Sequence, residues 1–113
     1  MRIDEQIREG VAVLSVSKVL TTELDVAPFC DRVKGLVQDD IRKVVVDFSQ
    51  VRWFGSAMLG ALIVSLTTLR NAGGDLRLAG LTERMDSILA VTHLAGIFRT
   101  LDTVDRAVAS FEA

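Results

Sequence analysis

The residues best placed to do chemistry lie in one short segment, GSAMLG at residues 55–60. Its glycine spacing matches the start of a phosphate-binding loop, but that loop needs Lys and then Ser or Thr after the second glycine, to reach the phosphates and the metal. Here Ala61 and Leu62 follow. Ser56 also lies outside the G-x-S-x-G frame of a nucleophile elbow. The segment therefore predicts neither nucleotide hydrolysis nor hydrolysis by an activated serine.

The other reactive side chains do not complete a catalytic or metal site. A serine nucleophile needs a histidine backed by a carboxylate, and nothing in the spacing brings His93, the one histidine, to Ser56. His93 is interpreted as a partly exposed residue near a helix end. One Cys, one His and no carboxylate cluster do not make a metal site. The sequence thus predicts no catalytic residue, no metal and no cofactor, and a protein that is not an enzyme.

The hydroxyl of Ser56 has two possible roles, as a site of phosphorylation or as a helix cap. At a helix N-terminus the first N–H groups are unpaired and the helix dipole is positive, so a phosphate of roughly −1.5 to −2 charge is tolerated on this side chain. Ser56 is then a regulatory phosphorylation site. Alternatively Ser56 is only an N-cap, which contributes about 1 kcal/mol to stability.

A buried strand and an apolar helix must position this serine. The valine run from Lys43 to Phe48 is typical of a strand covered by helices. The helix is predicted to open at Gly55 and Ser56 and to stop at Gly73-Gly74, where a left-handed residue is needed. Its apolar residues recur at spacings of three and four, as a helix buried over most of its circumference requires; they are Leu59, Leu62, Ile63, Leu66 and Leu69.

The remaining pattern predicts strands over residues 3–8, 11–16, 75–79 and 98–101, and helices within 21–38, 82–94 and 103–111. In the first of these helices Thr22 is the predicted cap and Pro28 belongs near the first turn. Gly96 is expected to stop the second. The apolar face of the first is expected to contain Leu24, Ala27, Val33, Leu36 and Val37.

This order of elements predicts a single α/β domain over residues 1–113. Strands that alternate with helices favour a mixed, mostly parallel β-sheet, here of four to five strands packed by about four helices. Half of the 113 residues are hydrophobic, which is enough for a real core.

Composition also excludes some classes of function. The 13 basic and 15 acidic side chains are scattered, without the basic stripe that nucleic-acid binding uses. The apolar run from Trp53 to Leu66 is too short for a membrane span and is interrupted by glycines, so no membrane insertion is expected. Cys30 is alone and Met1 to Gly10 is mostly charged, so we expect a cytoplasmic protein.

Three stretches together resemble a known family. They are VVVDFSQVRWFGSAMLGAL at 44–62, NAGGDLRLAGL at 71–81 and ILAVTHLAGIFRTLDTVDRAVASF at 88–111. In order and spacing the chain is similar to the STAS domain of bacterial anti-sigma factor antagonists. The family signature is an acidic residue, Ser or Thr, a small or hydroxyl residue, Gly, Leu, Gly. Ser56 occupies the phosphoacceptor position, whereas Gly55 replaces the acidic residue and Met58 replaces the first glycine.

The resemblance implies partner switching. The unmodified domain would bind an anti-sigma factor that is also a serine kinase of the histidine-kinase-like ATPase type, and phosphorylation of Ser56 would end the binding. The implied partner-binding residues are Phe54, Gly55, Ser56, Met58 and Leu59. Met58 is expected on the exposed first turn of the helix, where a flexible apolar side chain suits a protein contact.

Two other functions are compatible with the sequence. A STAS domain can be a scaffold subunit of a transporter or of a lipid-trafficking ATPase complex, so the class of partner discriminates between these roles. The third hypothesis is a small-ligand sensor with a cleft near the same helix N-terminus. The residues alone leave the oligomeric state open.

Overall fold

The first two predicted strands form an N-terminal hairpin that starts the sheet. The computed structural model describes residues 1–18 and 20–112. Strands β1 (Arg2–Arg8) and β2 (Val11–Ser17) pair antiparallel. Glu9 and Gly10 between them have φ of 55° and 79°. Positive φ at both central residues matches the twist of a two-residue hairpin turn, which accounts for the glycine at this corner.

The sheet continues through three parallel strands, β3 (Lys43–Asp47), β4 (Asp75–Ala79) and β5 (Arg99–Leu101). The strands lie in the order β1-β2-β3-β4-β5, so β1 and β5 are the edges. The predicted fold class is confirmed: the domain is α/β with a mixed, mostly parallel five-stranded sheet.

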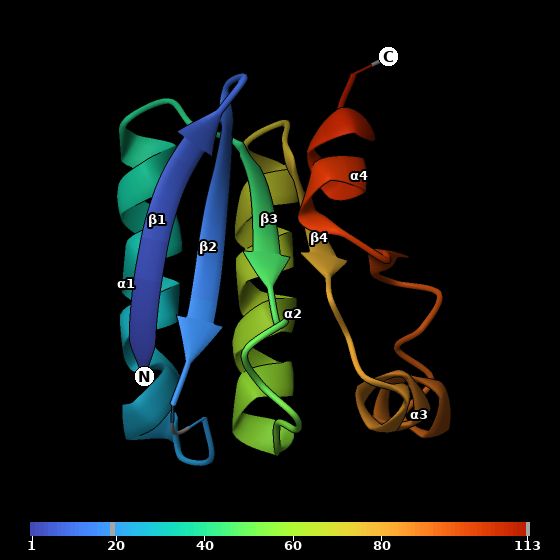
Figure 1. The fold of residues 1–113 in the computed structure, drawn as a ribbon. Coiled ribbons are helices and arrows are strands. Elements are labelled where there is room, and N and C mark those ends of the chain that lie inside the picture. Colours follow the sequence, from blue (N-terminus) through green and yellow to red (C-terminus); the bar gives the residue numbers. More distant parts are fainter. Residues whose placement is uncertain (19, 113) are drawn as a thin grey trace.

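Helices cover the two faces of this sheet unequally (Figure 1). Helices α1 (Glu23–Gln38) and α2 (Ser56–Asn71) pack on one face, where the larger hydrophobic core lies. Helix α3 (Glu83–Val91) follows β4 and closes the end of that core through Met85 and Leu89. Helix α4 (Val104–Ala109) covers the other face, where a small core contains Val11, Val45 and Val108.

The start of α1 is capped as predicted. The hydroxyl of Thr22 accepts a hydrogen bond from the backbone N–H of Asp25 (3.1 Å), and the N–H of Thr22 donates to the Asp25 carboxylate (2.9 Å). The backbone N–H of Thr22, and then its hydroxyl, lower the pKa of Asp25 because both stabilise the carboxylate. This capping box sets where α1 begins.

Part of the predicted apolar face of α1 is wrong. Leu24 is 87% exposed and Ala27 is exposed. The buried side chains are Val26, Phe29, Val33 and Leu36. Their spacing of three, four and three keeps them on one stripe, whereas Leu24 points away from the sheet.

Pro28 also lies further from the start of α1 than predicted. It is the sixth residue of the helix, in the second turn and not the first. Proline has no N–H to donate to the carbonyl four residues earlier, here that of Leu24. Leu24 is strongly exposed, so water can reach this part of the helix and the cost of the missing bond is reduced.

The ends of the later elements differ from the prediction. Helix α3 stops at Val91, and His93 adopts a left-handed φ of 60°, which Gly96 was expected to provide. The N–H of Leu94 then donates to the carbonyl of Leu89 at 2.8 Å and closes the helix end. His93 is exposed just past this end, in line with its interpretation.

Candidate partner-binding site

The loop from β3 to α2, residues 48–55, brings Ser56 to the surface. Asp47, the last residue of β3, shapes its first turn. One carboxylate oxygen of Asp47 accepts a hydrogen bond from the N–H of Ser49 (2.9 Å) and the other accepts from the hydroxyl of Ser15 (3.1 Å). Asp47 therefore acts as a turn-forming residue at the end of the strand.

Two phenylalanines anchor this loop in the core. The rings of Phe48 and Phe54 meet edge to face with centroids 5.2 Å apart, and both side chains are fully buried. At the far side, the hydroxyl of Thr82 donates to the carbonyl of Arg52 at 3.1 Å and ties the loop to the start of α3. The loop is thus fixed at both ends before α2 begins.

Trp53 lies over the position that precedes the serine. A Cβ built on Gly55 would be 3.3 Å from the Cη2 atom of the Trp53 ring, which is tighter than an ordinary contact. The guanidinium carbon of Arg84 lies 5.6 Å from the centroid of the same ring. Gly55 has φ −101° and ψ −170°, a backbone conformation open to any residue. The backbone therefore does not require glycine here, and a side chain at this position would need the indole ring to shift by a few tenths of an ångström.

Ser56 is the first residue of α2 and Gly55 is its N-cap. The interpretation of Ser56 as the N-cap is therefore wrong, because the non-helical residue that flanks the helix is the glycine. No side chain caps this end, and the first turn holds no acidic residue. Ser56 is exposed, and within residues 1–18 and 20–112 its hydroxyl takes part in none of the side-chain hydrogen bonds found. The hydroxyl is accessible for modification.

Ser56 also lies at one end of a groove between α1 and α2. The groove has a volume of about 430 Å³ and a mostly apolar lining. Its lining contains several small residues, among them Ala27, Cys30, Ala57 and Gly60, and also Val64, which is 52% exposed. A Cβ on Gly60 would meet nothing within 4 Å. Neighbouring atoms therefore do not exclude a larger residue at this position. Glycine, which has no side chain, leaves more space in the groove than any other residue would.

The five residues expected to bind a partner divide into two sets. Gly55 and Ser56 reach the surface, whereas Phe54, Met58 and Leu59 are 0%, 0% and 8% exposed. The expected exposure of Met58 is wrong. A helix that packs on a sheet buries the side chains three and four residues apart on one stripe, and Met58 shares its stripe with Leu62.

Sequence reasoning missed the contribution of α1 to this surface. Glu23, Ala27, Cys30 and Asp31 line the groove although they lie some 30 residues before Ser56. The sequence contained part of this information: Leu24 and Ala27 are apolar residues that lie outside the buried stripe of Val26 and Phe29, so they form an apolar patch away from the sheet. The packing of α1 beside α2 nevertheless follows only from the tertiary structure.

Comparison with protein families identifies the fold. The family model for the STAS domain matches residues 2–107, which is most of the chain. This chain belongs to the STAS domain family. Gly55, Ser56 and Met58 stand at the signature positions that the resemblance assigns, and in this STAS domain the first two are at the surface and the third is in the core.

Solved structures share the fold at low sequence identity. A protein of Thermotoga maritima is 23% identical, with a TM-score of 0.90, over 98% of this chain and 95% of that one. An anti-sigma factor antagonist from Mycobacterium paratuberculosis is also 23% identical, with a TM-score of 0.82, over 99% and 94% of the two chains. The phosphorylated form of the Bacillus cell fate determinant SpoIIAA is 12% identical, with a TM-score of 0.74, over 96% and 98%.

The apolar helices of this STAS domain serve its core. Among the residues that the structure describes, no helix combines the length and hydropathy needed to cross a membrane. Helix α2, the most apolar, has 16 residues and buries seven of them.

Proposed function

We propose that this STAS domain is an anti-sigma factor antagonist that acts by partner switching in the cytoplasm, without catalysing a reaction itself. In its unmodified form it binds an anti-sigma factor that is a serine kinase of the histidine-kinase-like ATPase type. Phosphorylation of Ser56 ends this binding. The observation that carries the proposal is the exposed Ser56 hydroxyl, at the first position of α2 and at the open end of the groove.

The surroundings of Ser56 are compatible with a phosphate. The start of α2 has unpaired N–H groups, no capping side chain and no acidic residue in its first turn, so a dianion meets a positive dipole end. The nearest acidic residues of the groove, Glu23 and Asp31, belong to α1. A phosphate on Ser56 would leave the buried side chains of α2 in place. It would change the charge of the groove end, where an apolar partner surface cannot accept an unpaired dianion.

The proposed contact surface does not contain all five residues that the resemblance implies. Gly55, Ser56 and the groove between α1 and α2 face the partner directly. Phe54, Met58 and Leu59 support this surface from the core, since their side chains are buried in the free domain. Trp53 lies beside Gly55, the residue at the acidic position of the signature, and with 39% of its surface exposed it adds an aromatic side chain to the surface next to the serine.

The test compares wild type with Ser56→Asp. Each tagged variant is expressed in the native cells, and captured proteins are quantified and identified by mass spectrometry. Wild type should retain a protein with an ATPase-type kinase domain, and Ser56→Asp should retain about tenfold less of it, equivalent to about 1.4 kcal/mol of binding. Thermal unfolding of the two variants should differ by no more than about 1 kcal/mol, the scale of a helix-end substitution.

Thr67→Asp is the matched control. It adds the same charge at an exposed position of α2, three turns from Ser56, and should leave the capture unchanged. Equal capture by wild type and Ser56→Asp would contradict the proposal. Capture of a transporter subunit instead of a kinase would favour the scaffold function. The same purified wild type should carry phosphate on the peptide that contains Ser56 in part of the population.

A further inference from the structure

The outer edge of β1 is a long and regular strand edge. β1 runs for seven residues and pairs with β2 residue for residue, from Arg2 opposite Ser17 to Arg8 opposite Val11, without a bulge. Among the described residues no strand pairs with its other side. Natural sheets protect an edge with charged side chains, lysine above all, with an inward-pointing charge, with proline, with a bulge or with a short strand. The opposite edge, β5, has only three residues. β1 is longer and has no proline, lysine or bulge, but four of its seven residues are charged, and Glu5, on the core side, is paired with Arg32.

The side chains of β1 divide cleanly between the two faces of the sheet. Residues directly opposite each other in an antiparallel pair point to the same side. Ile3, Glu5 and Ile7 lie opposite core residues of β2 on the α1 side. Asp4, Gln6 and Arg8 lie on the α4 side, and Arg8 pairs there with Asp105 of α4 at 2.8 Å. Ile7 is 48% exposed, so the strand presents an apolar side chain next to its charges.

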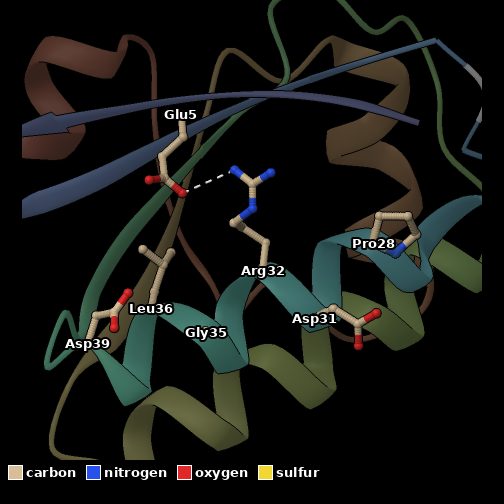
Figure 2. Close-up of a pocket in the computed structure, with 7 residues that line it drawn as sticks. All are labelled: Glu5, Pro28, Asp31, Arg32, Gly35, Leu36 and Asp39. Carbon is tan, nitrogen blue, oxygen red and sulfur yellow. Dashed lines mark hydrogen bonds and ion pairs between the residues drawn. The ribbon is translucent and has the colours of Figure 1, made fainter.

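A hollow runs beside this edge, between β1 and α1 (Figure 2). It has a volume of about 570 Å³, and Asp31 is the one lining residue that it shares with the groove that contains Ser56. Glu5 of β1 and Arg32 of α1 form an ion pair across it at 3.1 Å. Pro28 and Gly35 of α1 line the same hollow.

Pro28 and Gly35 are costly residues for the inside of a helix. They are seven residues apart and so on one flank, and a Cβ on Gly35 would meet nothing within 4 Å. The described chain gives no packing reason for this glycine. A strand added to β1 would lie about 4.8 Å further out, alongside this flank of α1. The compact ring of Pro28 and the missing side chain of Gly35 leave room for such a strand.

We propose that two copies of this chain pair through their β1 strands, antiparallel, around a two-fold axis at Gln6. This register places Asp4 of each copy opposite Arg8 of the other, on the same face, and Gln6 opposite itself. In the single chain these two charges have exposed partners, Arg2 for Asp4 at 3.5 Å and Asp105 for Arg8 at 2.8 Å, so the new pairs would add to or replace these contacts. It also places Ile7 opposite Glu5, whose charge is already neutralised by Arg32. The ten strands of the two copies form one continuous sheet.

Charge complementarity and the length of the paired segment together select this register. An axis at Ile3 would also oppose unlike charges, Arg2 with Asp4, but it would pair only residues 2–4 of the strand. An axis at Glu5 would oppose Glu5 with Glu5 and Arg2 with Arg8, and an axis at Asp4 would oppose Asp4 with Asp4. Like charges directly opposite each other destabilise a strand pair, whereas opposite charges stabilise it. Among the axes at Asp4, Glu5 and Gln6, only the last avoids a like-charge pair.

The pairing leaves the candidate partner-binding site free. The hollow lies on the β1 flank of α1, and the groove with Ser56 lies on its α2 flank. The dimer therefore carries two accessible Ser56 residues. Two sites on one particle bind a two-fold symmetric partner with a higher effective concentration than two separate domains do.

The experiment measures mass by sedimentation velocity and light scattering over a micromolar to millimolar series. Wild type should form dimers. Asp4→Arg places two arginines opposite each other and should raise the dimer Kd by about tenfold or more. Arg8→Asp should do the same with two acids. A mixture of the two variants should dimerise again. In the mixed dimer the introduced arginine of one variant faces the introduced aspartate of the other, and the native Arg8 of the first faces the native Asp4 of the second.

Controls separate this interface from loss of fold and from the proposed function. Asp86→Arg makes the same charge change on an exposed site of α3 and should leave the dimer intact. If Asp4→Arg loses its circular dichroism signal, Gln6→Lys provides a second variant, with two lysines meeting at the axis. Asp4→Arg should still capture the partner of wild type, and Ser56→Asp should still dimerise. Wild type that stays monomeric throughout the series, or Asp4→Arg that dimerises like wild type, would overturn the proposal.

Discussion

Two residues in the first turn of α2, Ser56 and Met58, lie in opposite environments, one in solvent and one in the core. Ser56 is at the surface, and its hydroxyl forms no hydrogen bond within the described part of the chain, whereas Met58, two residues later, is fully buried. A step of two residues rotates the side chain by about 200° around the helix axis, from solvent to sheet. The departure from the family glycine at Met58 is thus a feature of the core. A substitution such as Met58→Glu would introduce a buried charge, so it would report on folding and not on partner contact.

We predict that Met58→Ala lowers the free energy of unfolding by about 2–5 kcal/mol, the range for truncating a large buried side chain. Urea denaturation followed by circular dichroism measures this. Ile63→Ala, on the same helix and 37% exposed, is the control and should cost less than about 1.5 kcal/mol, because less apolar surface leaves the core. A loss for Met58→Ala no larger than that of Ile63→Ala would mean that Met58 faces solvent.

At the scale of elements, three glycines in and after α2 serve three different purposes. Gly73 has φ of 88° and ends the helix in the left-handed conformation. Gly74 has no such backbone need, but a Cβ there would lie 1.8 Å from the carbonyl oxygen of Arg42. Gly60 has neither constraint and lines the groove. The glycine pair expected to stop the helix therefore combines a helix stop with a close approach of two chain segments.

We predict opposite effects for two alanine substitutions. Gly60→Ala should stabilise the domain by about 0.5–1 kcal/mol, because alanine restricts the unfolded chain and has open space in the helix. Gly74→Ala should destabilise it by more than about 2 kcal/mol, because the new Cβ meets backbone that cannot yield. Thermal unfolding of both variants measures the two effects. Destabilisation by Gly60→Ala would show that the groove at Gly60 is packed in solution.

At the scale of the whole molecule, the sheet separates a large core from a small one. Val44 and Val46 point to the core under α1 and α2, while Val45 points to the small core under α4. β3 is paired on both sides, and its three valines are 0% exposed. At the edge, α4 spans six residues and β5 three. An ion–aromatic contact, with the Arg77 guanidinium 4.0 Å from the centroid of the Phe111 ring, helps to hold α4 down.

We predict that amide hydrogen exchange follows this asymmetry. The amides of Val44 to Val46 should exchange only through global unfolding, whereas those of β5 and α4 should open locally and exchange about tenfold faster or more. NMR exchange at several denaturant concentrations distinguishes the two regimes. Equal protection of α4 and β3 would show that the domain opens as one cooperative unit. As a second test, Arg77→Ala should raise the exchange rates of the α4 amides and leave those of β3 unchanged, because the contact with Phe111 holds that helix.

The order of elements, and with it the fold class, was determined by the sequence itself. Period-two and period-three-to-four patterns, the Thr22 cap and the glycine turns are local signals, and local signals specify local structure. The same holds for Ser56 at the start of α2, which the change of period after Phe54 already indicates. Helix ends such as His93 were less predictable, because a non-glycine residue takes the left-handed conformation there.

Only the tertiary structure decided which side chains form surfaces. The burial of Met58, the exposure of Leu24 and the position of the Trp53 ring over Gly55 depend on the direction in which each helix meets the sheet. The groove beside Ser56 and the hollow beside β1 each combine segments that are far apart in the chain. Packing between distant segments is a property of the folded chain as a whole, so no short stretch of sequence contains it.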